Sequence, residues 1–157
     1  GAKEAVDYVV SRGLFSGGSD STFGSDIAMT RQMTWVVLAR MDGESPKDMN
    51  EARSWAMAKG ISDGTNPKNN VTREQMAVLL YQYAKYKNYD TTQRTVDTLQ
   101  FKDYDSISTY AKDAQNWTVA TKLIYGNENK LIPQGYATRA QVAAILQRFL
   151  QNVMKEY

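Results

Sequence analysis

The sequence contains neither cysteine nor histidine. This absence excludes disulfide bonds, metal sites with thiolate or imidazole ligands, and the nucleophilic sites of Cys-His and Ser-His-Asp enzymes. It also removes the side chain that most often shuttles protons near neutral pH. Catalysis would therefore have to use carboxylates, lysine, tyrosine or a cation bound by oxygen ligands.

Long apolar runs and a strong excess of one charge are also absent. No apolar stretch approaches the roughly 20 residues needed to cross a bilayer, and the first residues lack the charged-then-apolar pattern of a secretory signal. The chain has 19 basic and 17 acidic residues, a net charge of +2, and no basic run. We therefore expect neither membrane insertion nor nucleic-acid binding through bulk positive potential.

One pattern occurs three times along the chain. A short helix ends in a glycine-marked turn, a loop follows, and Thr-Arg opens a second helix. The copies read AVDYVVSRGLFSG…MTRQM, ARSWAMAKGISDG…VTREQM and AQNWTVATKLIYG…ATRAQV. A repeat of this size indicates one supersecondary unit that buries a shared core with its neighbours. A chain of 157 residues can form one such domain and bury roughly 70% of its unfolded surface.

The first helices of the copies are predicted at about 2–12, 48–59 and 110–122. Each carries an aromatic residue at the same place, and each turn carries a glycine at the same place; these are Tyr8, Trp55 and Trp117, and Gly17, Gly64 and Gly126. Gly13 and Gly60 stand where a helix needs a left-handed terminating residue. The third copy has Lys122 there, so we expect its helix end to close differently.

The Thr-Arg helices have the clearer apolar periodicity. Positions seven, eight and eleven after the threonine are Val37, Leu38 and Met41, then Leu79, Leu80 and Tyr83, then Ile145, Leu146 and Phe149. This spacing makes one apolar stripe on each helix, and we expect the three stripes to face one another in a central bundle. Polar segments at 41–48 and 86–100 are predicted to be surface connections. The segment 101–103 after them is compatible with a short extended stretch.

The threonine of each Thr-Arg pair is predicted to be a helix N-cap, because its hydroxyl can accept a hydrogen bond from a first-turn amide. Gln75 and Gln141, three residues further on, complete capping boxes in the second and third copies. The first copy has Met33 at that position and loses half of the box. Capping therefore accounts for these threonines without any ligand.

The arginine after each cap is harder to explain as structure. A cation at the positive end of a helix is disfavoured by roughly 0.3–1 kcal/mol unless something offsets it. The arginine could pair with a carboxylate of the protein, and Asp7, Asp63 and Asp113 are near enough in sequence. It could instead join the helix terminus in holding an external anion. The residues alone leave both explanations open.

The matching aromatics are also open to two interpretations. Tyr8, Trp55 and Trp117 can be core residues, which is the commoner role of such side chains. An aromatic ring near a guanidinium is also what a sugar acid requires, because the ring covers the apolar face of the sugar while the guanidinium takes its carboxylate.

With these motifs the sequence resembles the S-layer homology domain family, whose members usually carry three such units and a Thr-Arg-Ala-Glu-like motif opening the second helix of each. The third unit is the most characteristic, and the second is nearly as good. In the first, Phe23-Gly24-Ser25 replaces the usual aromatic-x-Pro, and TRQM replaces the motif. The fourth motif residue is Met33, Gln75 or Gln141, never glutamate.

The resemblance implies an all-α fold with a pseudo-threefold arrangement of three helix-loop-helix repeats around a central three-helix bundle. The repeats would occupy about 1–43, 44–87 and 101–153 of a single domain, with a polar connection at 88–100. Grooves between neighbouring repeats would bind the ligand. In the family, the motif arginine contacts the carboxylate of a pyruvyl ketal on a sugar, and carry-over of the motif assigns this role to Arg31, Arg73 and Arg139. The matching repeat positions add six candidate groove residues: Tyr8, Trp55, Trp117, Gly17, Gly64 and Gly126.

The resemblance also implies a function. It suggests a non-catalytic module, monomeric in isolation and part of a larger secreted protein, that attaches to the bacterial cell surface. The partner would be a secondary cell wall polysaccharide, bound through a pyruvylated, anionic terminal sugar, and no cofactor is expected. The absence of cysteine is compatible with export, since folding needs no disulfide step.

Three other functions compete with this interpretation. A structural module of an S-layer or adhesin could keep this fold and lose glycan binding, and the weak first copy favours that alternative. A glycan-cleaving enzyme would need a carboxylate pair, but Asp103 and Asp105 are more simply explained as solvated turn residues. A calcium loop around residues 62–66 lacks the alternating oxygen ligands and the closing glutamate.

Overall fold

The computed structural model describes residues 2–15, 24–93 and 97–156. The described residues form six α-helices, namely α1 (Ala2–Ser11), α3 (Arg31–Met41), α4 (Met49–Ala58), α5 (Arg73–Tyr86), α6 (Lys112–Ala120) and α7 (Arg139–Asn152). Short 3-10 turns η1 (Asp97–Gln100), η2 (Tyr104–Ser106) and η3 (Thr109–Ala111) precede α6. These described residues contain no strand beyond isolated bridges. The predicted all-α fold is confirmed.

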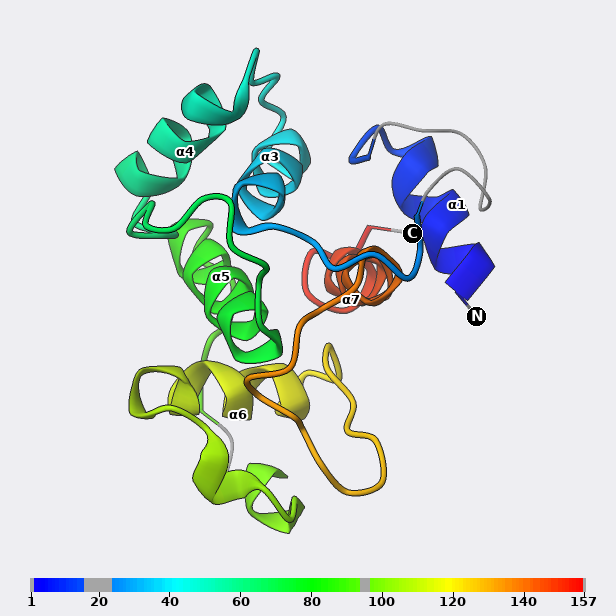
Figure 1. Cartoon of the computed structure of the whole chain (residues 1–157), viewed down its shortest axis with the longest axis vertical. Helices are drawn as coiled ribbons and strands as arrows, with labels where there is room; N and C mark the ends of the chain where they lie inside the picture. Colours follow the sequence, from blue (N-terminus) through cyan, green and yellow to red (C-terminus); the bar gives the residue numbers. More distant parts are fainter. Residues whose placement is uncertain (1, 16–23, 94–96, 157) are drawn as a thin grey trace.

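Each short first helix packs against the Thr-Arg helix of the preceding copy. Helix α4 packs on α3, α6 packs on α5, and α1 packs on α7 (Figure 1). The last pairing joins the first and last helices of the chain. The packed helix pairs are therefore offset from the repeats that the sequence suggests, because α3 and α4 pair across a boundary between two copies.

The loops before the Thr-Arg helices meet in a closed ring of backbone hydrogen bonds. The amide of Met29 donates to the carbonyl of Ala137 (3.0 Å), that of Ala137 donates to Val71 (3.1 Å), and that of Val71 donates to Met29 (2.8 Å). All three residues are at most 1% exposed. The ring joins the three copies at the point where their second helices begin.

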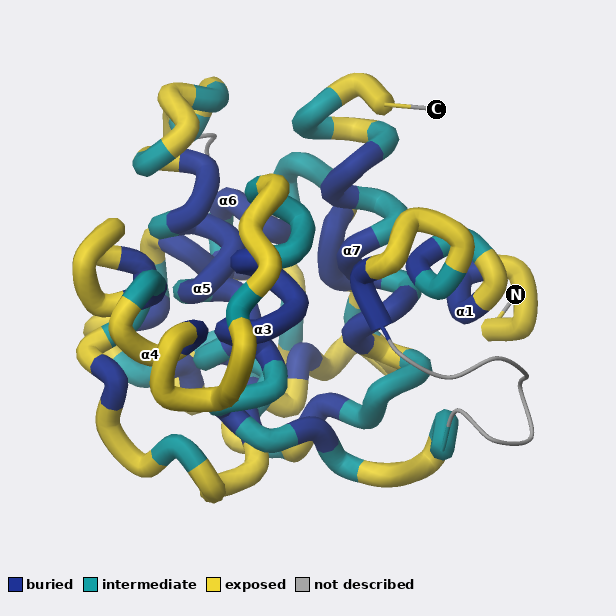
Figure 2. The backbone as a smooth tube through the Cα atoms, turned by 90° about the horizontal axis from the view of Figure 1, so that it is seen from above, coloured by how far each residue is buried: buried dark blue, intermediate teal, exposed yellow. Residues whose placement is uncertain are grey.

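The core is one continuous cluster to which every α-helix contributes. Figure 2 shows the buried segments gathered where α3, α5 and α7 approach one another, with exposed segments at the periphery. The predicted apolar stripes are buried except at Met41, which is half-buried. The rings of Tyr83 and Phe149 meet edge to face at 5.7 Å, so the stripes of α5 and α7 touch directly.

The helix starts follow the sequence prediction. Thr30, Thr72 and Thr138 are N-caps whose side chains accept hydrogen bonds from the amides three residues on. The full capping box is present at α5 and α7. At α3 the threonine accepts from Met33 at 3.4 Å, without the reciprocal side-chain bond.

The prediction that the third copy closes its first helix differently is wrong. Lys122 has a φ of 62°, close to the 72° of Gly13 and the 71° of Gly60. The same pair of backbone hydrogen bonds closes all three turns, from Gly13 and Leu14, from Gly60 and Ile61, and from Lys122 and Leu123. The hydrogen bonds and core position of the turn outweigh the steric cost of a side chain in this conformation.

The stretch at 101–103 is also not extended. It lies between the 3-10 turns η1 and η2, and the ring of Phe101 packs against the core. Asp103 is more than a solvated turn residue, because its carboxylate accepts hydrogen bonds from the amides of Leu131 (2.9 Å) and Ile132 (2.8 Å). It thereby fixes the loop that leads to α7.

Candidate ligand-binding grooves

The first amides of the Thr-Arg helices are bonded within the protein. In each helix the amides of the arginine and of the next residue donate to backbone carbonyls of a loop from another copy, at 2.8–3.2 Å. The acceptors are Asn69 and Pro67 for α3, Gly135 and Pro133 for α5, and Ile27 and Ser25 for α7. The side chain of the threonine cap accepts a hydrogen bond from the amide of the third helical residue. These helix termini therefore do not offer free amides to an external anion, so an anion would have to be held by side chains.

The arginine side chains also bond to the neighbouring loop. Nε of Arg31 donates to the carbonyl of Thr65 (2.9 Å), and Nε of Arg73 donates to that of Leu131 (2.8 Å). Thr65 and Leu131 each lie seven residues before the next cap, so the two contacts are equivalent. Backbone carbonyls thus provide a third way to offset a cation at the helix start, one that sequence reasoning did not consider.

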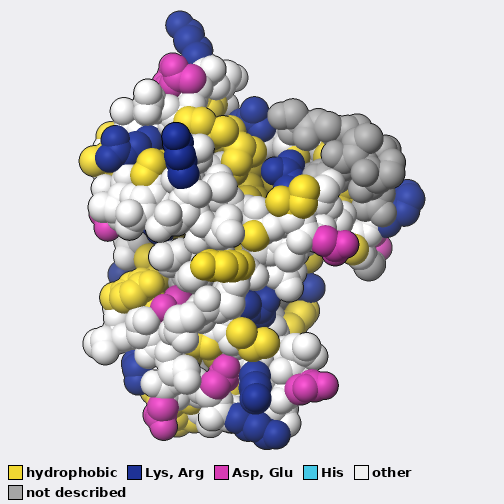
Figure 3. Space-filling model, viewed as in Figure 1, with side chains coloured by type: hydrophobic (Ala, Val, Ile, Leu, Met, Phe, Trp, Pro, Cys, Tyr) yellow, Lys and Arg dark blue, Asp and Glu magenta, His cyan; other side chains and the backbone are white. Residues whose placement is uncertain are grey.

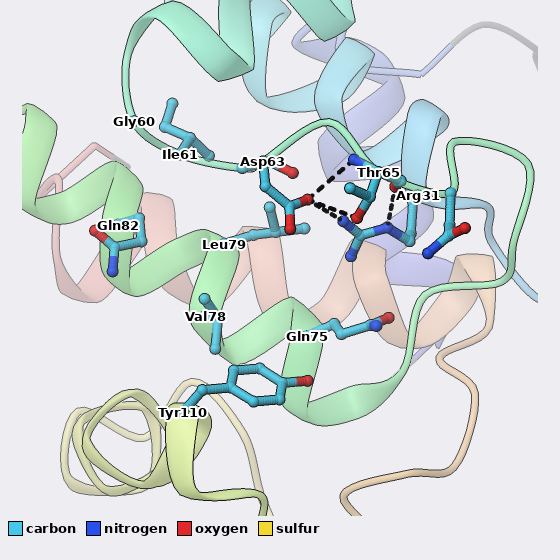
Figure 4. A pocket seen from close by; sticks show the side chains of 12 residues that line it. Arg31, Gly60, Ile61, Asp63, Thr65, Gln75, Val78, Leu79, Gln82 and Tyr110 are labelled. Carbon is cyan, nitrogen blue, oxygen red and sulfur yellow. Dashed lines mark hydrogen bonds and ion pairs between the residues drawn. The ribbon is translucent and has the colours of Figure 1, made fainter.

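The Arg31 groove lies between α3, the turn after α4, and α5 (Figure 4), with a cavity of about 450 Å³. Its lining includes Arg31, Asp63, Gln75, Gln82 and Tyr110. Nη2 of Arg31 lies 3.2 Å from Oδ1 of Asp63, an ion pair in which the arginine side chain is 10% exposed and the aspartate 70%. The same Oδ1 accepts the amide (3.0 Å) and hydroxyl (2.7 Å) of Thr65. The Thr65 amide is the main reason that the pKa of Asp63 lies below its usual value.

Tyr110 stands on the opposite side of this groove from the ion pair (Figure 4). The residue is 62% exposed, and its hydroxyl lies 3.4 Å from a carboxylate oxygen of Glu74. Glu74 is 3% exposed and accepts hydrogen bonds from the amide (2.9 Å) and hydroxyl (2.6 Å) of Ser108. Burial and the Glu74 carboxylate raise the pKa of Tyr110, so its hydroxyl stays protonated at neutral pH.

The Arg73 groove occupies the corresponding place between α5, the turn after α6, and α7. Its cavity of about 300 Å³ is lined by Arg73, Tyr125, Asn127, Gln141 and Arg148 among others. Nη2 of Arg73 donates to the carbonyl of Tyr125 (3.2 Å), and the Arg148 guanidinium carbon lies 4.3 Å from the centre of the Tyr125 ring. Burial lowers the pKa of Arg73, partly offset by the charge of Asp103. The described residues give Arg73 no ion pair.

The two grooves correspond position by position. Counting from the caps and turns of the repeat, Arg31 matches Arg73, Gln75 matches Gln141, Asp63 matches Tyr125, and Gln82 matches Arg148. The charged groups lining the Arg31 groove are thus an arginine and an aspartate. Those lining the Arg73 groove are two arginines.

Arg139 begins α7 and points toward the first copy. Its guanidinium carbon lies 5.2 Å from the centre of the Phe15 ring, and burial lowers its pKa. The loop that would complete its groove includes residues 16–23, which lie outside the described residues, as does the predicted site residue Gly17.

The predicted aromatics do not line the Arg31 and Arg73 grooves. Trp117 is 1% exposed and donates to the carbonyl of Asp90 (3.0 Å), while Trp55 is half-buried against the core. Tyr8 is half-buried, with the Arg12 guanidinium carbon 3.6 Å from its ring centre. The grooves are lined instead by Tyr110 and Tyr125, which the repeat alignment did not single out because they have no aromatic counterpart in the other copies.

The remaining predicted glycines lie in tight packing. A side chain at Gly64 would meet the Met57 sulfur at 2.5 Å, and one at Gly126 would meet the Phe101 ring at 2.3 Å. Each sits in the turn beside a groove, directly after Asp63 or Tyr125. Close packing thus explains these glycines and also fixes the residues before them.

The described part of the chain contains no cluster of three or more acidic side chains placed to hold a metal ion. None of its helices is both long and apolar enough to cross a membrane. On the face shown in Figure 3, basic and acidic side chains are interspersed outside the grey residues.

Residues 100–143 match the model of the S-layer homology domain family. This segment runs from the end of η1 into the first turns of α7 and covers most of the third copy. The matched segment is the copy whose motifs most resemble that family.

Three relatives match nearly the whole chain, and each is a much longer protein. An endoglucanase of Bacillus sp. (strain KSM-635) is 30% identical over 89% of this chain, an amylopullulanase of Thermoanaerobacterium thermosulfurigenes 26% over 96%, and the exoglucanase XynX of Acetivibrio thermocellus 28% over 96%. The chain spans 17%, 9% and 16% of their lengths.

A solved structure has a similar fold. It is the undecaheme cytochrome from the S-layer of Carboxydothermus ferrireducens, which matches 96% of this chain and 20% of its own, with a TM-score of 0.52 and 16% sequence identity. At this identity the likeness concerns the fold alone.

Proposed function

We propose that this chain is a non-catalytic anchoring module that attaches a larger secreted protein to the bacterial cell surface by binding a secondary cell wall polysaccharide. The S-layer homology match supports the anchoring role, and the three matched glycan-degrading enzymes are long enough to hold a catalytic domain elsewhere. The isolated module would be a monomer and would need no cofactor.

The observation that carries the proposal is the charge of the Arg73 groove. Arg73 is half-buried, its guanidinium is bonded to backbone carbonyls alone among the described residues, and Arg148 lines the same cavity. A partly desolvated cation that makes no ion pair with the described residues favours an anionic ligand, although the more distant Asp103 charge also acts on it, and a guanidinium can bind a carboxylate with two parallel hydrogen bonds. Tyr125, 53% exposed, offers a ring for the apolar face of a sugar.

The finer part of the proposal is the ligand: a terminal sugar with a pyruvyl ketal, whose carboxylate contacts the arginine. By the repeat pattern Arg31 and Arg139 are the counterparts of Arg73. The repeat pattern alone supports Tyr8, Trp55 and Trp117, since they do not line the Arg31 and Arg73 grooves, and Gly17, Gly64 and Gly126 remain proposed groove residues. For Gly64 and Gly126 the structure supports a role in shaping the turn rather than a direct contact.

The test is a pull-down of the 157-residue chain with bacterial cell-wall sacculi before and after chemical stripping of the secondary polysaccharide. We expect retention only before stripping, and release by a pyruvylated sugar but not by the same sugar without the ketal. The matched control is Lys47→Ala, which removes an exposed cation outside both grooves. Equal retention on stripped sacculi would contradict the proposal.

A structural module without glycan binding is the second candidate. The ion pair between Arg31 and Asp63 favours it at the first groove, since this arginine already has a carboxylate partner. The same pull-down separates the two functions, because a purely structural module would not distinguish intact from stripped sacculi.

A further inference from the structure

We propose that the Arg31 groove binds an uncharged saccharide unit, so that the two grooves of the module take chemically different parts of one polymer. The inference rests on the proposed polysaccharide-binding function and adds a substrate class for a groove that has an arginine but does not suit an anion. It follows from three features of the Arg31 groove: its charge, its aromatic wall and its polar lining.

The charge argument concerns Arg31 and Asp63. A ligand carboxylate that approached Arg31 would meet the Asp63 carboxylate, 3.2 Å from the same guanidinium nitrogen. Two carboxylates at one cation repel each other, and the Arg31 side chain is too buried for water to screen this repulsion fully. Asp63 would not move aside easily, because the amide and hydroxyl of Thr65 also hold its Oδ1.

Nearby charges outside the grooves do not change this contrast. Lys68 lines a second cavity that Arg31 and Gln75 also line, and Glu4 lines one that Gln141 and Arg148 also line. Both residues are exposed, so solvent and salt weaken their effect. The groups that line the grooves themselves therefore decide which ligand charge is accepted.

The shape and lining of the groove suit a neutral sugar. Tyr110 is 62% exposed on the wall opposite Arg31 (Figure 4), and its hydroxyl lies 3.4 Å from the carboxylate of the buried Glu74, so the ring can contact the apolar face of a pyranose. Asp63, 70% exposed at its side chain, can accept hydrogen bonds from sugar hydroxyls, and the amide of Gln82 can donate and accept. The cavity of about 450 Å³ lies within the usual size range of small-molecule sites.

The test uses two probes: methyl N-acetyl-β-glucosaminide and its 4,6-pyruvyl ketal, which carries a carboxylate and a methyl group on a second ring and lacks the free 4- and 6-hydroxyls. Each is titrated into the nitrogen-15-labelled chain while backbone amide shifts are recorded by NMR. The amides of Asp63 and Thr65 report the Arg31 groove, and those of Tyr125 and Asn127 report the Arg73 groove. We expect the neutral glycoside to shift the first pair at lower concentration than the ketal does, and the ketal to shift the second pair.

Variants separate charge from shape. Asp63→Asn should raise the affinity of the ketal at the Arg31 groove by about tenfold, because the repelling carboxylate is gone and the side-chain shape is kept. Asp105→Asn, an exposed carboxylate outside both grooves, is the control. Tyr110→Ala should weaken the neutral glycoside about three- to tenfold, and Tyr110→Phe, which keeps the ring, should restore it.

The outcomes distinguish this inference from the function on which it rests. If the ketal shifts Tyr125 and Asn127 while the neutral glycoside leaves Asp63 and Thr65 unmoved, the polysaccharide-binding function stands and this inference is wrong. If the wild-type Arg31 groove prefers the ketal, the inference is also wrong. If neither sugar shifts either pair, both proposals fail.

Discussion

The Arg31 and Arg73 grooves share one backbone frame and differ in the charge of the side chains placed on it. In both, the helix amides and the arginine Nε bond to the same carbonyl positions of the neighbouring loop. The first groove then has Asp63 and Gln82 where the second has Tyr125 and Arg148. The repeat therefore conserves its scaffold through backbone contacts, which depend little on side-chain identity, and leaves the groove walls free to change specificity.

The largest expected effect is the difference in retention on sacculi between the Arg73→Ala and Arg31→Ala variants. Arg73→Ala should weaken retention on sacculi by about ten- to hundredfold, because it removes a charge-assisted contact with the ligand. Arg31→Ala should weaken retention by no more than about threefold, since that arginine is paired with Asp63. Equilibrium binding to intact sacculi measures both.

Unfolding of the same two variants provides the control. Arg31→Ala removes an ion pair and a hydrogen bond, and Arg73→Ala removes hydrogen bonds to Leu131 and Tyr125, so each should lower the free energy of unfolding by about 1–2 kcal/mol. Equal losses of retention in the two variants, or a loss that follows stability alone, would remove the distinction between the grooves.

A smaller effect is expected from exchanging Gln82 and Arg148, the second pair of residues in which the two grooves differ. Arg148→Gln gives the Arg73 groove the residue of the Arg31 groove, and it should weaken binding of a pyruvylated sugar about three- to tenfold. The reciprocal Gln82→Arg adds a cation beside Arg31 and should strengthen binding of that sugar there. Calorimetric titration measures the first change and groove-resolved NMR the second. An unchanged affinity in Arg148→Gln would mean that Arg148 serves only its contacts within the protein, the Tyr125 ring and the carbonyl of Leu123.

The smallest expected effect concerns the turn beside each groove. Gly60 forms this turn at the Arg31 groove, and Lys122 forms it at the Arg73 groove with a φ of 62°. Lys122→Gly should relieve the strain and raise the free energy of unfolding by about 0.5–1 kcal/mol, the gain being reduced by the added freedom of glycine in the unfolded chain. Chemical denaturation measures it, and Lys130→Gly, at a residue with another backbone conformation, should show no such gain.

Local signals in the sequence predicted local structure well. The threonine caps, the two capping boxes, the incomplete box at Met33 and the helix bounds follow from hydrogen bonding within one or two turns. The buried stripes follow from periodicity. The pseudo-threefold arrangement and the repeat bounds stay predictions, although the recurring loop-to-helix hydrogen bonds support them.

Features that depend on contacts between copies could not be predicted in this way. The pairing of α1 with α7 and the backbone ring involve residues far apart in the chain. The bonds of the first helix amides also go to loops of other copies, so the sequence alone could not exclude that these amides hold an external anion. At Lys122 a local signal gave the wrong prediction. Lysine disfavours a left-handed backbone conformation, but the contacts around the turn impose it.

The contact between α1 and α7 would have a mechanical consequence for the proposed anchoring function. The first and last helices of the described chain lie against each other, so a pull on either end acts first on this one pairing. The ring of Met29, Val71 and Ala137 lies behind it, with each copy bonded to both others. Tension from a tethered domain would thus have to separate two packed helices before it reached the loops that shape the grooves.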